Sequence, residues 1–367
     1  MKIMYLSSSV IPSPEANSVQ VSRMCDNFAR EHDVVLVCRR GDPFTPEGFR
    51  AQYGLQSDFR VVRLWWPRVP VLGSSIYALQ VLVFVLCQRR PDVFYARHLI
   101  SLWLVRFMGV PIIYEAHMPV SSRMAKLLCG QLFRSQTFRR LVCVSAKLLS
   151  HYQQVFTSIT AQNSLVAPNG ADRLEPGGQA NESCLQESIV GYIGSAKKEK
   201  GIDLVLELAR RMPSQSFCIA GPSKEALLSL GHNVPDNVNL LGFLSQQEIT
   251  GLLGQLAVVL APYKPGQADG PQSLKDDAHW GSPLKIFEFM SAGKCIIASD
   301  IEIVRELIGD GEEGVLCPPE DVDAWRGALE ELLDDEEKRR RLSANGQLRF
   351  AKNFDRSVRA RCVLEGL

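Results

Sequence analysis

The sequence predicts an α/β fold built from two Rossmann-like, doubly wound domains. The chain has 367 residues, which is enough for two domains of ordinary size. It opens with an apolar strand at 2–6, a loop, a helix at 19–30 and a second strand at 34–38, the order in which doubly wound sheets begin. The same order starts again at 189, after a stretch rich in Gly, Glu and Gln at 173–187 that is typical of a linker.

The composition narrows the classes of protein to which the chain can belong. A hydrophobic fraction of 46% with 22% charged residues indicates a folded globular chain, and a net charge of +1 without a long basic run gives no indication of nucleic-acid binding. The 10 cysteines form no C-x-x-C pair, so we interpret them as reduced thiols in a cytoplasmic protein. The first residues enter a strand and do not resemble a signal peptide. The most apolar segment, 76–87, is too short to span a bilayer and is predicted to be a packed helix.

Polar residues follow two strands of the first domain. Asn17 is expected to cap a helix, with Gln20 at the capping-box position. Glu115 and His117 come at the carboxyl end of a strand at 111–117, and their spacing of two would point both side chains the same way. Ligands of doubly wound sheets bind at this edge, although a single His at such a place is also compatible with a structural role.

A capped helix at 281–294 organises the second domain. Ser282 is expected to be its N-cap, Pro283 its first residue and Gly293 its end. The free N–H groups and the positive dipole end of such a helix bind anions, and Glu288 lies one turn further on the face of Lys285. This pattern predicts a phosphate site beside a carboxylate, and a purely structural helix with the same caps is the alternative.

A lysine-rich loop connects a strand at 189–194 to the next helix. Lys197, Lys198 and Lys200 lie in it, where they would bind a diphosphate, each charged hydrogen bond contributing about 1.5–3 kcal/mol. A solvated loop would have the same composition.

Two more segments are candidates for contact with a ligand or a lipid. The polar loop at 264–280 is long for a compact domain and precedes the capped helix, so we expect a lid. The segment 122–140 alternates basic and apolar residues and is predicted to be one amphipathic helix. An ordinary solvated face on a core-packed helix is the favoured interpretation, and contact with an anionic membrane stays open.

The stretch Ser-Pro-Leu-Lys-Ile-Phe-Glu-Phe-Met-Ser-Ala-Gly-Lys at 282–294 resembles the donor-site signature of GT-B glycosyltransferases. It is most similar to the retaining group-4 family, of the group 1 type, and to a sub-branch with the Ser-Pro-Leu-Lys form. The loop after the first strand, 115–117, Pro-Asn-Gly-Ala-Asp at 168–172 and Lys200-Gly201 resemble further family segments in the same order. Two departures stand out. Trp280 replaces the first of two family glutamates, and Ser195 or Gly194 stands where the family has an Arg.

The resemblance implies a GT-B arrangement in which the two domains face each other. An acceptor-binding domain would cover 1–172, a linker 173–187 and a nucleotide-sugar-binding domain 188–350, with a helix at 351–367 crossing back to the first domain. It also implies a retaining, metal-independent hexosyltransferase without a cofactor. This enzyme would move a sugar from a UDP or GDP sugar to a sugar or lipid-linked acceptor during surface polysaccharide or glycolipid assembly. Its expected location is the cytoplasm, with peripheral contact at the inner face of the membrane.

The resemblance also assigns roles to individual residues. The expected catalytic residues are His117, Glu288 and Lys200. The residues expected to bind the donor are Ser195, Lys197, Lys198, Lys200, Gly242, Phe243, Ser282, Pro283, Leu284, Lys285 and Glu288. The residues expected to position the acceptor or the sugar are Ala16, Asn17, Ser18, Glu115 and His117, and no metal site is expected.

Three other functions stay open. A non-catalytic partner subunit that binds a nucleotide sugar would explain the missing Arg and the missing first Glu. A nucleotide-sugar epimerase of the same fold would need no acceptor. A two-domain binding protein for a small ligand is disfavoured because no export signal is recognised.

Overall fold

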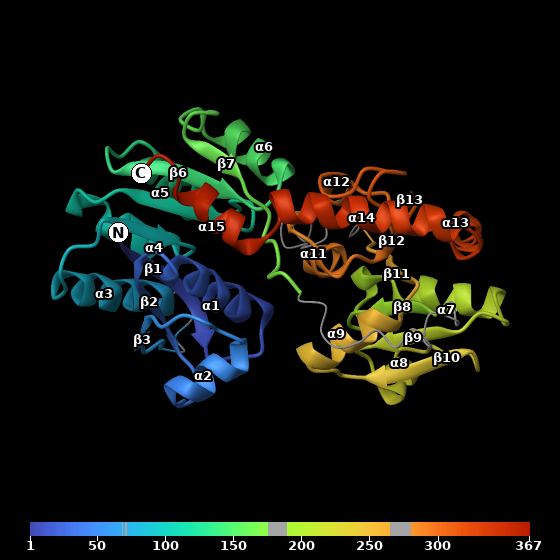
Figure 1. Ribbon diagram of the computed structural model, residues 1–367. Coiled ribbons are helices and arrows are strands. Elements are labelled where there is room, and N and C mark those ends of the chain that lie inside the picture. The colour runs from blue at the N-terminus through green and yellow to red at the C-terminus, as the bar shows by residue number, and fades with distance from the viewer. Residues whose placement is uncertain (68, 70–71, 175–188, 265–279) are drawn as a thin grey trace. The chain divides into compact units, whose positions relative to one another are not determined.

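The computed structural model describes residues 1–67, 69, 72–174, 189–264 and 280–367, and the chain forms two compact units (Figure 1). The first unit comprises Met1–Asn169 with Arg359–Leu367, and the second comprises Gly170–Val358. Apart from residues 173–174, 264 and 280, the expected linker at 173–187 and the expected lid at 264–280 lie outside the described residues.

The first unit contains a seven-stranded parallel sheet in the order β3-β2-β1-β4-β5-β6-β7. Its strands are β1 (Lys2–Ile11), β2 (Asp33–Arg40), β3 (Arg60–Leu64), β4 (Val93–Ala96), β5 (Ile112–Ala116), β6 (Phe138–Cys143) and β7 (Ser164–Val166). Its helices are α1 (Ala16–Ala29), α2 (Pro46–Tyr53), α3 (Leu72–Leu86), α4 (Leu99–Val105) with the 3₁₀ turn η1 (Arg106–Met108), α5 (Arg123–Phe133) and α6 (Ala146–Val155). The strand order reverses between β1 and β4, which confirms the doubly wound topology.

The second unit contains a six-stranded parallel sheet in the order β10-β9-β8-β11-β12-β13. Its strands are β8 (Val190–Ile193), β9 (Phe217–Ala220), β10 (Val238–Gly242), β11 (Val258–Ala261), β12 (Cys295–Ser299) and β13 (Val315–Cys317). The helices described on it are η3 (Lys198–Lys200), α7 (Ile202–Arg211), α8 (Lys224–Ser229), α9 (Gln246–Gln255), α11 (Leu284–Ser291), α12 (Glu302–Arg305), α13 (Val322–Asp334) and α14 (Glu336–Asn353). Here the order reverses between β8 and β11.

The end of the chain returns to the first unit through α15 (Arg356–Leu364). Ala360, Val363 and Leu364 are buried in the core formed by α1 and the first strands. Arg140 fixes the last turn, because its guanidinium donates to the carbonyls of Cys362, Val363 and Glu365 at 3.2, 3.1 and 2.8 Å. The final segment is therefore an integral part of the first unit.

Two boundaries differ from the sequence prediction. The first strand extends through Ile11 into the expected loop, because a bulge between Leu6 and Val10 lets the serine-containing continuation pair again with β2. The expected amphipathic helix at 122–140 is wrong beyond Phe133, since Phe138–Cys143 is a buried strand. Arg140 consequently belongs to β6 and binds the chain end rather than lining a helix face.

The apolar segment at 76–87 forms most of α3, but packs on one side only. Tyr77, Ala78, Val81 and Val85 are buried against the unit, while Leu79 and Val83 on the other side are exposed. In the described part of the chain, no helix combines the length and the apolarity needed to cross a membrane.

Candidate functional site

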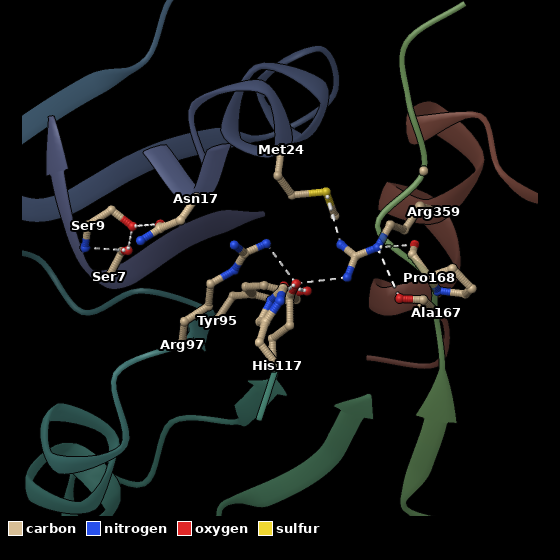
Figure 2. A network of polar contacts seen from close by, with 12 residues as sticks. Ser7, Ser9, Asn17, Met24, Tyr95, Arg97, His117, Ala167, Pro168 and Arg359 are labelled. Atoms are coloured by element: carbon tan, nitrogen blue, oxygen red, sulfur yellow. Dashed lines mark hydrogen bonds and ion pairs between the residues drawn. The ribbon is translucent and has the colours of Figure 1, made fainter. Parts of the chain in front are cut away.

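A buried carboxylate lies at the carboxyl end of β5. Glu115 Oε1 accepts from Arg97 Nη2, His117 Nε2 and Arg359 Nη2, each at 2.8 Å, and Glu115 Oε2 accepts from the Tyr95 hydroxyl. Figure 2 shows these groups converging from β4, the end of β5 and α15. Burial alone would raise the pKa of Glu115, but Arg359 and Arg97 outweigh it and hold that pKa well below its usual range. Glu115 is therefore a fixed anion.

His117 rests on this anion. Its side chain is 29% exposed, whereas that of Glu115 is fully buried. Burial and the Arg97 guanidinium lower the pKa of His117 to about 4, against the opposing effect of Glu115. The neutral imidazole then carries its proton on Nε2, where Glu115 accepts it, and Nδ1 has the lone pair of an acceptor. The arrangement presents a neutral histidine of fixed tautomer at the edge of the sheet.

Two serines and an asparagine lie near the carboxyl end of β1. Ser7 Oγ and Ser9 Oγ are 2.7 Å apart, and Ser9 Oγ also donates to Asn17 Oδ1 (Figure 2). The prediction that Asn17 caps α1 is wrong. The helix begins at Ala16 after Glu15, and the extended β1 brings Ser9 to Asn17 instead. Ser18 Oγ donates to the Val10 carbonyl at 2.8 Å, so it also ties α1 to β1.

These groups meet where the strand order of the first sheet reverses. Ser9 lies in the last part of β1 and Asn17 in the first turn of the helix after it, while Arg97 follows β4; β1 and β4 are the two strands that flank the reversal. In doubly wound sheets this switch point is where ligands bind. Sequence reasoning found Asn17, Glu115 and His117 but missed Tyr95, Arg97 and Arg359.

The equivalent point of the second sheet lies between β8 and β11. The lysine loop follows β8 and forms the turn η3, which ends at Gly201 with φ +68. A Cβ at Gly201 would stand 1.8 Å from the Pro262 carbonyl oxygen, directly after β11. Glycine is required here both by its positive φ and by this close approach.

Lys200 is held at this junction by aromatic neighbours. Its Nζ lies 5.0 Å from the ring centroid of Tyr263, and its carbonyl accepts from the Tyr192 hydroxyl at 3.3 Å. The same hydroxyl donates to the Ser195 carbonyl at 2.8 Å and so fixes the loop at a second position. Lys197 and Lys198 are exposed at the surface. Of the three lysines, Lys200 is the one placed between the ends of β8 and β11.

Helix α11 ends where predicted. Ile286, Phe287, Phe289 and Met290 are buried, so one side of the helix is anchored in the core. Gly293 adopts φ +63 just beyond the last turn, which confirms its role as the stop.

The predicted start of α11 is wrong by one residue. Leu284 is the first helical residue, and Pro283, with ψ 98, is the N-cap without a side-chain hydrogen bond. Ser282 therefore precedes the cap. The ψ of Pro283 is extended rather than helical, which delays the first turn. The free N–H groups still lie in the first turn of a helix that follows β11.

Glu288 forms an ion pair on the open side of α11. Its Oε2 accepts from Lys285 Nζ at 2.8 Å, and the two side chains are 20% and 29% exposed. The pair agrees with the expectation that both residues share a helix face. A carboxylate and an ammonium group one turn into the helix are thus partly accessible to solvent.

Gly242 ends β10, the edge strand of the second sheet beside β9, and Phe243 directly follows it. The Gly242 carbonyl accepts from Gly221 N at 2.7 Å, and the Phe243 side chain is 90% exposed. An aromatic ring this exposed at a strand end is available to stack on a planar ligand.

The two departures from the family pattern have a structural context. A Cβ at Gly194 would lie 2.6 Å from the Tyr192 hydroxyl, so a larger residue there would displace this tyrosine side chain. Ser195 is exposed and Trp280 is buried. Among the described residues, no three His, Cys, Asp or Glu side chains gather as a metal ion would require.

Comparison with known proteins identifies the class. Residues 179–349 match the family described as Glycosyl transferases group 1, and residues 18–173 match Glycosyltransferase Family 4. Both units are covered, and the chain belongs to the GT-B glycosyltransferases of the group 1 family. The prediction of the family and of the two-domain α/β fold is confirmed at this level.

The individual relatives either match only part of this chain or have low sequence identity to it. Alpha-D-kanosaminyltransferase of Streptomyces kanamyceticus is 31% identical over 43% of this chain and 39% of its own length. Glycogen synthase of Mycobacterium tuberculosis is 24% identical over 72% of this chain and 66% of its own. The chain thus spans less than two thirds of these relatives. The crystal structure of Anabaena HepE in complex with UDP has a TM-score of 0.72 at 17% identity, covering 100% of this chain and 99% of that one.

Proposed function

We propose that the protein is a retaining glycosyltransferase that moves a hexose from a nucleoside diphosphate sugar to an acceptor hydroxyl. The observation that carries the proposal is that one aromatic ring adjoins both candidate groups: Lys200 Nζ lies 5.0 Å from the centroid of the Tyr263 ring, and Glu288, paired with Lys285 on α11, adds to burial in raising the pKa of Tyr263. A cation and free backbone N–H groups bind a diphosphate, and a partly exposed carboxylate binds ribose hydroxyls. HepE, of the same fold, has been crystallised with UDP-glucose, which supports UDP as the first nucleotide to test.

The donor site is built from three strand ends of the second unit. Ser195, Lys197, Lys198 and Lys200 surround the diphosphate after β8, and Ser282, Pro283, Leu284 and Lys285 continue it at the start of α11. Gly242 and the exposed Phe243 flank the base. Negative charge develops on the leaving diphosphate, and groups already oriented toward it lower the barrier. On this account the reaction needs no metal ion.

The first unit binds the acceptor and positions the transferred sugar. Nδ1 of His117 accepts a hydrogen bond from a sugar hydroxyl, because Glu115 holds the proton on Nε2. Ala16, Asn17 and Ser18, at the start of α1, supply polar groups beside the same sheet edge. Retention of configuration and a role in surface polysaccharide or glycolipid assembly follow the family resemblance. The corresponding location is the cytoplasm, at the inner face of the membrane.

A thermal-shift panel of nucleoside diphosphates and their sugars tests the donor site. A bound nucleotide raises the melting temperature with the logarithm of its concentration above Kd, so UDP or GDP should stabilise the protein selectively. The selected donor is then incubated with and without mixed acceptor glycans or lipids.

The incubation separates the alternatives. Transfer of the sugar with retained anomeric configuration is the expected result. Conversion of the donor to its epimer without an acceptor would indicate an epimerase, and binding without transfer or hydrolysis would indicate a non-catalytic subunit. Absence of any nucleotide effect on melting would refute the donor site itself.

A further inference from the structure

Helix α3 exposes a continuous apolar stripe. Leu72, Ile76, Leu79, Val83 and Leu86 are between 36% and 64% exposed. Their spacing of four and three residues aligns them along one side of the helix. A surface helix ordinarily carries charged residues on this side, yet α3 has no charged residue along its 15 residues. An open apolar side of this length indicates a binding surface.

The stripe continues onto the next two helices. Helix α4 packs beside α3, and α5 packs beside α4, so the three helices are neighbours in the first unit. Phe107, Met124 and Leu127 on these neighbours are exposed as well. Together with the stripe on α3 they form what we term the α3–α5 face.

Charge around the α3–α5 face is predominantly positive. Between Trp65 and Arg140 the only acidic residues are Asp92 and Glu115. Glu115 is buried in the site, and Asp92 accepts from the backbone N of Lys2 at 2.6 Å at the opposite end of β4. Arg106 lies 3.8 Å from the ring centroid of Phe107, Arg123 and Lys126 lie in α5 with Met124 and Leu127, and Arg89 and Arg90 follow the end of α3.

We propose that the α3–α5 face docks on the surface of an anionic lipid bilayer. Apolar side chains enter the boundary between headgroups and acyl chains, while the surrounding cations meet the lipid phosphates. A second copy of the chain fits less well, because two such faces would bring Arg123 and Lys126 against like charges. A bilayer offers an apolar layer for the apolar side chains and anionic phosphates for the surrounding cations.

The face begins beside the cluster around Glu115. Ser74, in the first turn of α3, lies 2.9 Å from Nε2 of His98, and His98 directly follows Arg97. A docked bilayer would therefore border the part of the first unit to which we assign the acceptor, as a lipid-linked acceptor requires. This last step rests on the proposed function, whereas the docking itself does not.

Co-sedimentation of the full chain with lipid vesicles tests the proposal. We expect binding to vesicles rich in phosphatidylglycerol, little binding to phosphatidylcholine alone, and weakening by salt. Leu79→Gln with Val83→Gln should reduce the partition coefficient at least tenfold, about the loss from removing two inserted aliphatic side chains. Arg123→Gln with Lys126→Gln should reduce it about fivefold per charge.

Matched variants of the second unit are the controls. Leu228→Gln with Leu348→Gln removes exposed apolar side chains, and Lys224→Gln with Lys352→Gln removes exposed charges, all in the second unit. Circular dichroism verifies that each variant is folded. The proposal would be overturned if the wild-type protein did not bind anionic vesicles, or if the controls lost as much binding as the face variants. A dimer abolished by the Leu79 and Val83 substitutions, without vesicle binding, would assign the face to a second copy instead.

Discussion

Arg359 Nη2 lies 2.8 Å from Glu115 Oε1, joining two residues that are 244 positions apart in the chain. The same guanidinium donates through Nε to the Pro168 carbonyl at 2.8 Å and approaches Met24 Sδ at 3.4 Å. Arg359 thus connects α15 to the strand that carries the candidate sugar-positioning residues. The chain end holds the anion on which His117 depends.

Substitution of Arg359 should destabilise the first unit strongly. Arg359→Gln leaves Glu115 buried with one guanidinium fewer, and breaking a buried ion pair in this way costs about 3–5 kcal/mol. Because Arg97 remains, we expect a value near the lower limit. Hydrogen exchange of the β5 amides in native protein measures it without requiring the two units to unfold together.

The neighbouring Arg361 supplies the control for Arg359. It lies on the same helix but is exposed, so Arg361→Gln should change stability by no more than about 0.5 kcal/mol. Equal β5 protection in both variants would mean that Arg359 does not support the site.

Acid should weaken the first unit before its carboxylates are protonated. Burial lowers the pKa of His98 to about 4, and that of His117 is also about 4. Both folded pKa values lie below the unfolded value near 6.5, so the unfolded state binds more protons in between. The stability from the neutral rings is complete above about pH 6.5 and is lost as the pH falls toward 4. For the buried His98 the loss amounts to about 3 kcal/mol at most.

Histidine ring signals in an NMR titration check this directly. We expect the signals of His98 and His117, assigned from His98→Gln and His117→Gln, to stay in the neutral form at pH 6. Titration of His98 near 6.5 would contradict its burial as a neutral ring, and titration of His117 near 6.5 would show that burial and Arg97 do not outweigh Glu115.

Removal of the Glu288 carboxylate should weaken nucleotide binding. Glu288→Ala removes the acceptor for ribose hydroxyls, and we expect affinity to fall by about 1–3 kcal/mol, the range for lost charged hydrogen bonds. Calorimetry with the selected nucleotide measures this change. The exposed Glu337→Ala on α14 should bind like wild type. Unchanged affinity in folded Glu288→Ala protein would exclude Glu288 from the site.

A chelator should leave transfer unaffected. Lys200, Lys285 and the start of α11 provide the positive charge that a diphosphate leaving group needs. We therefore expect equal initial rates with and without EDTA. A rate lost in EDTA and restored by Mg²⁺ would show that these groups do not suffice.

Much of the architecture could be predicted because its signals are local. Short apolar runs between turn residues marked most of the strands, and the spacing of Glu115 and His117 correctly placed them side by side. The predicted boundaries of helices and strands were wrong where contacts with a neighbouring element determine the local structure. Ser9 lies in the bulge between Leu6 and Val10, after which β1 pairs with β2 again, and Asn17 binds Ser9 instead of capping its helix.

The rest of the site depends on contacts between distant segments. Nothing near Arg359 in the sequence indicates that it is buried against Glu115, and Arg97 reads as an ordinary residue after a strand. The sequence also did not indicate which side of α3 is exposed. A uniformly apolar helix has no polar stripe to indicate which side the core leaves uncovered.

Calorimetric titration of wild-type and Lys200→Gln protein with UDP and with GDP, in the presence of EDTA, tests the donor site most directly. We predict saturable binding of one nucleotide to the wild type, and affinity weakened about tenfold or more by the loss of one charged hydrogen bond in Lys200→Gln. No binding of either nucleotide, or equal affinity in both proteins, would contradict a diphosphate site between β8 and α11.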